Sequence, residues 1–116
     1  MPHLHLEVTP GLVESERTAE ILGALVERLC AFPTIGSAAV KAYTTEHQAF
    51  SLGQGAAPGF VHLEVAILDG RGASLVQQIA DGMYAELKAL FAETLASGAA
   101  KATMELREMR ADTYRK

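Results

Sequence analysis

The fold is decided by the opening stretch MPHLHLEV, residues 1–8, in which polar and apolar residues alternate strictly from His3 to Val8. Successive side chains of a strand point to opposite faces, so this alternation predicts a strand with one buried face. Its last four residues, His-Leu-Glu-Val, recur at residues 62–65, about half the chain further on. The stretch therefore predicts an internal repeat as well as the first strand.

The first half continues with a break, a helix and a second strand. Residues 9–11, Thr-Pro-Gly, interrupt the strand, and apolar residues at intervals of three and four predict a helix from about Glu14 to Cys30. Pro33 ends that pattern. A second strand is predicted over Ala38–Thr44. The segment that follows is rich in glycine, and we expect a short extended arm at Ala49–Leu52.

The second half has the same order of elements. After the repeated tetrapeptide comes the glycine-rich turn Asp69–Gly72, and a long helix follows. Ser74 and Gln77 have the spacing of a capping box, which predicts Ser74 as the N-cap. Gly98 is expected to end the helix. The last strand is predicted over Ala102–Met109, where apolar and polar residues alternate again.

Two β-α-β halves, about 1–58 and 59–116, predict one α/β domain over residues 1–116: a two-layer sandwich with a four-stranded sheet and both helices on one face. The apolar positions facing the helices are expected to be Leu4, Leu6, Val8, Val61, Leu63, Val65 and Ile67. The opposite face would carry His3, His5, Glu7, Phe60, His62, Glu64 and Ala66. A polar face and open sheet edges predict a symmetric homo-oligomer.

Composition excludes several classes of function. The chain of 116 residues is 49% hydrophobic, carries a net charge of −4 and has no basic stretch, which disfavours binding to nucleic acid. No apolar run approaches the ~20 residues of a membrane helix, so no membrane partner is expected. The single Cys30 cannot form an internal disulfide, which favours a reducing cytoplasm. We interpret Cys30 as a small core residue.

Pro2 is a candidate catalytic residue because cells commonly remove an initiator methionine ahead of a small residue. The ring nitrogen of Pro2 would then be a free secondary amine, able to act as a base or a nucleophile. From the residues alone, a simpler interpretation stays open. A proline at the start of an edge strand needs no backbone donor, and Pro2 would then have only a structural role.

Several of these motifs together resemble the 5-carboxymethyl-2-hydroxymuconate Δ-isomerase family of the tautomerase superfamily, which also contains 4-oxalocrotonate tautomerase and macrophage migration inhibitory factor. The resemblance is carried by residues 1–3 (Met-Pro-His), residues 60–65 (Phe-Val-His-Leu-Glu-Val), the Gly70-Arg71 turn and the glutamines at positions 77 and 78. It extends from Pro2 to about Tyr114, and residues 35–59 match poorly.

This resemblance implies a cofactor-free homotrimer of double β-α-β subunits with Pro2 as catalytic base. The family moves a proton along a conjugated 2-hydroxydienoate to give the 2-oxo isomer. A free α-amine has a reference pKa of about 8, and burial and nearby cations lower it. We therefore expect Pro2 in an apolar pocket beside Leu4, with Arg71 and Lys41 close by. The alternative is a catalytically silent trimer of this fold that binds a ligand or a partner.

Arg71 and Lys41 are the candidate substrate-binding residues. Arg71 lies in a glycine turn ahead of a helix, and its planar guanidinium matches a carboxylate in two-point contact. The family carries an Arg-x-Arg pattern in the second strand, whereas this chain has Lys41-Ala42-Tyr43. One cation is changed and the other is missing, which points to a substrate with fewer carboxylates. A solvated turn arginine and an ordinary surface lysine are the alternatives.

The histidines raise the question of a metal site. His3 and His5 share a strand face, and the repeat brings His62 near them, but no spacing typical of a zinc site occurs. We expect histidines that form hydrogen bonds or line a channel, and no metal. Tyr43 and Tyr114 are further candidates for lining a pocket, across a subunit boundary.

Overall fold

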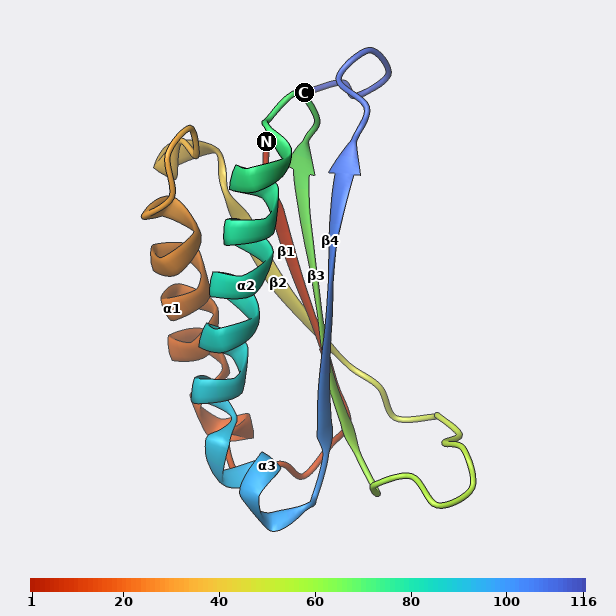
Figure 1. Cartoon of the computed structure of the whole chain (residues 1–116). Helices are drawn as coiled ribbons and strands as arrows, with labels where there is room; N and C mark the ends of the chain where they lie inside the picture. Colours follow the sequence, from red (N-terminus) through yellow and green to blue (C-terminus); the bar gives the residue numbers. More distant parts are fainter.

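The computed structural model describes residues 1–116, and it forms a four-stranded sheet with helices packed on one face (Figure 1). Its regular elements are β1 (His3–Val8), η1 (Ser15–Arg17), α1 (Thr18–Cys30), η2 (Ser37–Ala39), β2 (Lys41–Glu46), β3 (Phe60–Leu68), α2 (Ala73–Leu90), α3 (Ala92–Ser97) and β4 (Lys101–Met109). The two-layer architecture predicted from the sequence is confirmed.

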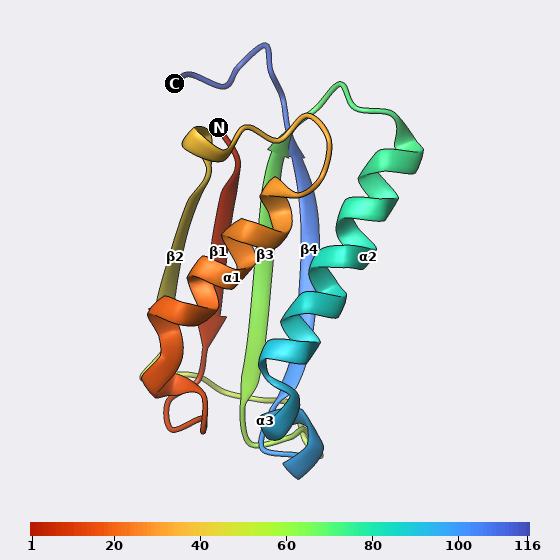
Figure 2. The same cartoon turned by 90° about the vertical axis from the view of Figure 1, so that its left-hand side faces the viewer.

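The strand order is β2-β1-β3-β4, which places the two copies of the repeated tetrapeptide on neighbouring central strands. β1 runs parallel to β2, and β3 runs parallel to β4, as a helical connection within each half requires. The halves meet through the antiparallel pair β1 and β3, in which Leu6 lies opposite Leu63. Figure 2 shows α1 and α2 side by side across the sheet, with both chain ends at the same end of the molecule.

The core lies between the helices and the apolar face of the two central strands. In β1 and β3 every second residue is buried, and Leu4, Leu63 and Val65 are fully buried. From the helices, Ile21, Leu25, Leu29, Ile79, Met83 and Leu87 complete the cluster. Cys30 is half-buried and packs against it. On the other face, Ala66 is also buried, between its sheet neighbours His3 and Arg107.

The first helix begins later than its pattern predicts, because Glu14 has another role. The Glu14 side chain is 1% exposed, and its carboxylate accepts hydrogen bonds from the backbone N–H of Thr94 (3.1 Å) and from the Thr94 hydroxyl. A carboxyl group this deeply buried needs such partners. The bond joins the two halves of the chain, and α1 starts only at Thr18, after the short helix η1.

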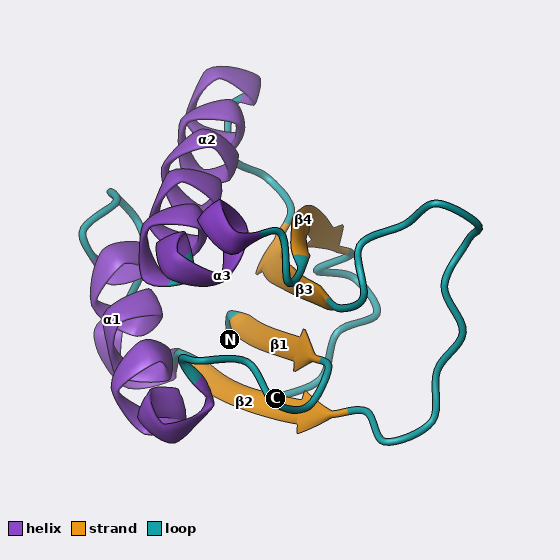
Figure 3. Ribbon diagram, turned by 90° about the horizontal axis from the view of Figure 1, so that it is seen from below, coloured by secondary structure: helices purple, strands orange, loops and turns teal.

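Several other boundaries differ from the prediction, and the helix expected to run to Gly98 is divided at Phe91 into α2 and α3. The N-cap of α2 is Gly72, and Ser74 forms no capping hydrogen bond, because the helix already begins at Ala73. The second strand starts at Lys41, since residues 37–39 form a 3₁₀ turn. The predicted arm at Ala49–Leu52 is not a strand. It belongs to a loop that projects from the sheet on the side away from the helices (Figure 3).

Two glycines of this loop, Gly53 and Gly59, provide a test of packing at the entry to β3. A Cβ on Gly59 would lie 2.5 Å from the Thr9 hydroxyl oxygen and 2.9 Å from the backbone oxygen of Ala99, whereas a Cβ on Gly53 would meet nothing within 4 Å. We expect Gly59→Ala to lower the free energy of unfolding by about 1–3 kcal/mol. Gly53→Ala should change it by no more than about 0.5 kcal/mol.

Denaturant unfolding of both variants and the parent chain, at one protein concentration, measures these differences. An equal effect of the two alanines would contradict the close packing at Gly59.

Candidate functional site

Pro2 directly precedes the central strand β1 and is buried. Its carbonyl accepts a hydrogen bond from the backbone N–H of Lys41 (3.0 Å), which fixes the beginning of β1 against the beginning of β2. Leu4, two residues further along β1, is fully buried on the same face. In the described chain Met1 precedes Pro2, and the free amine belongs to Met1.

The electrostatic environment of this amine is positive. Burial lowers the pKa of the Met1 amine below its usual value of 8.0, and the charges of Lys116, Lys41 and Arg71 lower it further, in that order. These cations come from the C-terminal tail, from β2 and from the turn before α2. Three segments that are distant in the sequence therefore bring positive charge to the amino terminus, and the two predicted cations are among them.

Arg71 is half-buried and held rigidly in its turn. Its Nε donates to the Thr34 hydroxyl (2.8 Å), one terminal nitrogen donates to the backbone oxygen of Leu68 (2.8 Å), and the other donates to the backbone oxygen of Thr34 (3.1 Å). Thr34 has a φ of 71°, which is uncommon for a residue other than glycine. Three of the five N–H groups of the guanidinium are used in this way, and two remain for a ligand.

Lys41 lies in a different setting. It is exposed at the first position of β2, directly opposite His3 in the parallel pair. No ion pair ties its ammonium group to a carboxylate within 4.0 Å. Lys41 and Arg71 therefore both supply positive charge near the amino terminus. The charge of Lys41 is unpaired, whereas the guanidinium of Arg71 is held in place by hydrogen bonds.

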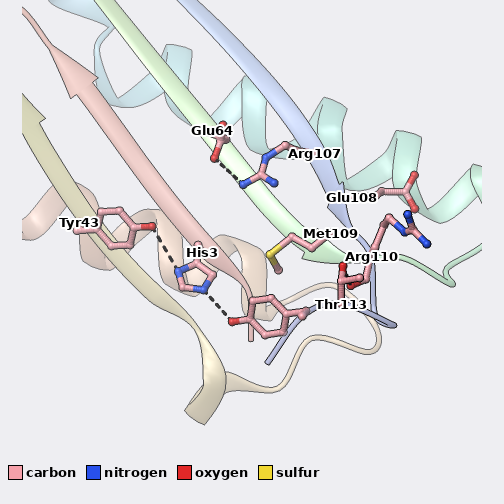
Figure 4. Close-up of a pocket in the computed structure, with 9 residues that line it drawn as sticks. His3, Tyr43, Glu64, Arg107, Glu108, Met109, Arg110 and Thr113 are labelled. Atoms are coloured by element: carbon pink, nitrogen blue, oxygen red, sulfur yellow. Dashed lines mark hydrogen bonds and ion pairs between the residues drawn. The ribbon is translucent and has the colours of Figure 1, made fainter. Parts of the chain in front are cut away.

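Beside the amino terminus, the face of the sheet that the helices leave uncovered carries a cavity of about 560 Å³ (Figure 4). Its lining residues are His3, Tyr43, Glu64, Arg107, Glu108, Met109, Arg110, Thr113 and Tyr114. Tyr43 and Tyr114 both line it within one chain. Sequence reasoning missed Arg107 and Arg110, although Arg107 occupies a polar position in the alternating pattern of β4.

His3 is at the centre of the hydrogen bonds in this cavity. Its Nε2 lies 3.0 Å from the Tyr114 hydroxyl, and its Nδ1 lies 3.3 Å from the Tyr43 hydroxyl. Arg107 instead pairs with Glu64 at 3.2 Å. Burial lowers the pKa of His3 below its usual value, and Lys41, the terminal amine and Arg107 lower it further. The neutral imidazole is therefore favoured.

The remaining histidines lie on the same uncovered face, and each has its own partner. His5 bonds to the Thr45 hydroxyl at 2.9 Å, and His62 bonds to the Thr103 hydroxyl at 2.7 Å. His47 bonds to the carboxylate of Glu7 at 2.9 Å. No group of three or more His, Cys, Asp or Glu side chains is arranged to hold a metal ion. No helix is both long enough and apolar enough to cross a membrane.

The model of the family described as 5-carboxymethyl-2-hydroxymuconate isomerase matches residues 2–116 of this chain. The chain belongs to this family. A solved structure of a 5-carboxymethyl-2-hydroxymuconate isomerase from Deinococcus radiodurans R1 is 30% identical in sequence, with a TM-score of 0.88. The alignment covers 99% of this chain and 87% of that one. The family membership makes the protein an isomerase.

More distant structures show the same fold. A macrophage migration inhibitory factor-like protein from Entamoeba histolytica is 11% identical, with a TM-score of 0.69 and coverage of 99% of this chain and 94% of that chain. A structure described as a fused 4-OT wild type symmetric trimer is 20% identical, with a TM-score of 0.65 and coverage of 93% and 85%. The comparison with curated proteins found no match. The tautomerase-like fold inferred from the sequence is thus confirmed.

The charge of Lys41 should be detectable at His3. After burial, Lys41 is the largest contributor to the lowered pKa of His3. Removing this positive charge favours the imidazolium, so we expect Lys41→Gln to raise the pKa of His3. NMR titration of the histidine ring resonances measures the shift. The control variant is Lys88→Gln, in which the lost charge lies over the ring of Tyr84 on α2. An unchanged His3 titration in Lys41→Gln would contradict the proximity of this charge.

Proposed function

We propose that this isomerase moves a proton in a 2-hydroxydienoate, or a related enol carboxylate, to give the 2-oxo isomer, with Pro2 as base once Met1 has been removed. The observation that carries the proposal is the position of buried Pro2 next to a cluster of cations, Lys41, Arg71 and Lys116, whose charges lower the pKa of the neighbouring Met1 amine. A base that works at neutral pH needs such a shift, because an ordinary secondary amine is protonated at that pH.

The proton transfers balance without any further reagent. The neutral Pro2 nitrogen takes the proton of the substrate hydroxyl, and the O–H electron pair forms the new carbonyl. The electrons of the conjugated chain shift toward a carbon atom, and that carbon takes the proton back from the Pro2 ammonium. The dienolate formed between these two steps is negatively charged, so fixed cations beside it lower the barrier.

Arg71 and Lys41 are proposed to bind the substrate's carboxylates. Arg71 supports this role because its guanidinium is held by Thr34 and Leu68 and still has two N–H groups free. A rigid cation loses little entropy on binding. Lys41 offers a point charge with no carboxylate partner. The charges of both residues lower the pKa of the terminal amine of Met1.

The proposal extends to the assembly and the setting of the protein. We propose a homotrimer, supported by the trimeric 4-OT structure of similar fold and by the sheet face that no helix covers. The two β-α-β units support the description of one domain made of repeated halves, about 1–58 and 59–116. The lone cysteine supports a cytoplasmic location. The family match supports a role in the degradation of aromatic compounds. A catalytically silent, ligand-binding trimer is the alternative that the experiments below distinguish.

The free amine can be tested by preparing the chain in two forms. One form is cleaved from a leader so that Pro2 is the first residue, and the other keeps one residue ahead of Pro2. We expect kcat/KM for an enol acid to fall by at least ~100-fold in the blocked form, because an amide nitrogen cannot take the proton. Intact-mass measurement verifies each terminus. Equal activity of the two forms would exclude Pro2 as the base.

Arg71 can be tested through its effect on substrates with different numbers of carboxylates. We expect Arg71→Ala to raise KM for a dicarboxylate by about tenfold or more, and Arg71→Lys to restore part of this loss. The control is Arg17→Ala, which removes an exposed arginine from η1. Initial-rate kinetics on a dicarboxylate and a monocarboxylate enol measure the effect. A KM that does not change in Arg71→Ala would show that Arg71 does not bind substrate.

A further inference from the structure

The C-terminal tail places Tyr114 against the opposite end of the chain. Its hydroxyl lies 3.4 Å from the carbonyl oxygen of Met1 and 3.0 Å from Nε2 of His3. The carbon of that carbonyl is bonded to the nitrogen of Pro2, so the hydroxyl contacts an oxygen that is two bonds away from the atom that becomes the free amine. In Figure 2 the tail runs from the end of β4 back toward the amino terminus.

The tail is held in this position by its own contacts. The backbone N–H of Tyr114 donates to the carbonyl of Arg110 at 3.0 Å, which closes a turn directly after β4. The backbone N–H of Ala111 donates to the Asp69 carboxylate at 3.2 Å, and Arg110 bonds to Asp112. Tyr114 is half-buried. These bonds link the tail to the β3–α2 turn, and they hold Tyr114 near Pro2.

The direction of the hydrogen bonds follows from the chemistry of their ends. A carbonyl oxygen only accepts, so the Tyr114 hydroxyl donates its single proton to Met1. The contact with His3 must then be an N–H donated from Nε2 to the Tyr114 oxygen. A neutral His3 with its proton on Nε2 has an unprotonated Nδ1, which accepts from the Tyr43 hydroxyl at 3.3 Å. The chain runs Tyr43 → His3 → Tyr114 → residue 1.

We propose that, once Met1 is removed, the Tyr114 hydroxyl donates a hydrogen bond to the nitrogen of Pro2, with His3 and Tyr43 fixing the direction of that bond. The proposal rests on the proposed function, in which this nitrogen is the base. The donor stabilises the amine in its neutral form. Because the nitrogen has a single lone pair, the substrate's hydroxyl displaces the Tyr114 donor before its proton is transferred. His3 and Tyr43 act through Tyr114 and are positioning residues.

Other groups act on the same nitrogen and must be kept constant in any test. The charged and titratable side chains around the amino terminus are Lys41 and Tyr43 on β2, His3 on β1, Arg71 before α2, Arg107 on β4, and Tyr114 and Lys116 in the tail. Tyr114→Phe leaves every charge in this set in place, and it removes only one hydroxyl group. Its effect on Pro2 therefore reports on the hydrogen bond.

The test uses protein that begins at Pro2, with the proline labelled with ¹⁵N. NMR titration gives the pKa of the Pro2 amine directly, and the acid limb of the pH profile of kcat/KM gives it during catalysis. We expect Tyr114→Phe to raise the pKa of the Pro2 amine from NMR, and the apparent pKa of the acid limb, by about half to one pH unit. This shift is a three- to tenfold change in the protonation equilibrium. KM and the rate at high pH should change much less. Tyr43→Phe should give a smaller rise in the same direction.

The control is Tyr84→Phe, which also removes a phenol hydroxyl from a hydrogen bond. The Tyr84 hydroxyl donates to the backbone oxygen of Ala102 (3.2 Å), between α2 and β4, and it belongs to no chain that reaches Pro2. This variant should leave the Pro2 titration unchanged. A purely structural role of Tyr114 would lower stability without moving the titration, so that result would overturn the inference.

The two proposals can fail separately. A Pro2 titration that shifts in Tyr114→Phe, in a protein without isomerase activity, would support the hydrogen bond and overturn the proposed function. An active enzyme whose titration and acid limb are the same in Tyr114→Phe, or are displaced to lower pH, would overturn the hydrogen bond alone. If Tyr114→Phe does not fold, Tyr43→Phe decides, because an unchanged titration there contradicts the chain of hydrogen bonds.

Discussion

β1 is hydrogen-bonded along both edges, to β2 on one side and to β3 on the other, and this pairing fixes the amino terminus in space. Most chain ends are mobile because nothing pairs with them. Here the Pro2 carbonyl already belongs to the ladder with Lys41, and Leu4 is locked in the core two residues later. A terminal base needs this rigidity, since a displacement of about 1 Å can cost a factor of ~100 in rate.

The same pairing leaves one face of the sheet uncovered, and all four histidines of the chain lie there. His5 and His62 are equivalent residues of the repeated tetrapeptide, and each bonds to a threonine of the neighbouring outer strand. Hydrogen bonds of this kind lower the cost of removing a polar face from water. In the proposed trimer this polar face would pack against other subunits, and the hydrogen bonds within it would make that burial less costly.

The sequence predicts an element of the fold well where a single local effect, such as burial of one strand face, determines that element. Alternation in β1 and β3 is decisive because one face is fully buried, and both strands were predicted well. β2 lies at an edge and is largely exposed, so its start was misplaced. Ser74 has a capping pattern, but Gly72 already serves as the N-cap. The burial of Glu14 depends on Thr94, a contact between the two halves that no local pattern encodes.

The site followed the same rule. Pro2, Lys41 and Arg71 are candidates that local motifs and the family resemblance predict, whereas the cavity, which none of them lines, needs tertiary information. Arg107 and Arg110 enter it only because β4 lies beside β3 and because the chain turns back after Met109. The contact between Tyr114 and Met1 joins residues at opposite ends of the chain. The alternation in β4 could have indicated on which face of the sheet Arg107 lies, but it could not have indicated which residues of other elements lie beside it.

Tyr43 connects the departure from the family pattern to the chemistry of the amine. It occupies the position at which the resemblance implies a second arginine, and its hydroxyl bonds to His3. Replacing an arginine with tyrosine removes a positive charge that would favour the neutral amine. A hydrogen bond donated to the nitrogen favours the same form. In the proposed arrangement, the chain through Tyr43, His3 and Tyr114 would therefore offset part of the missing charge.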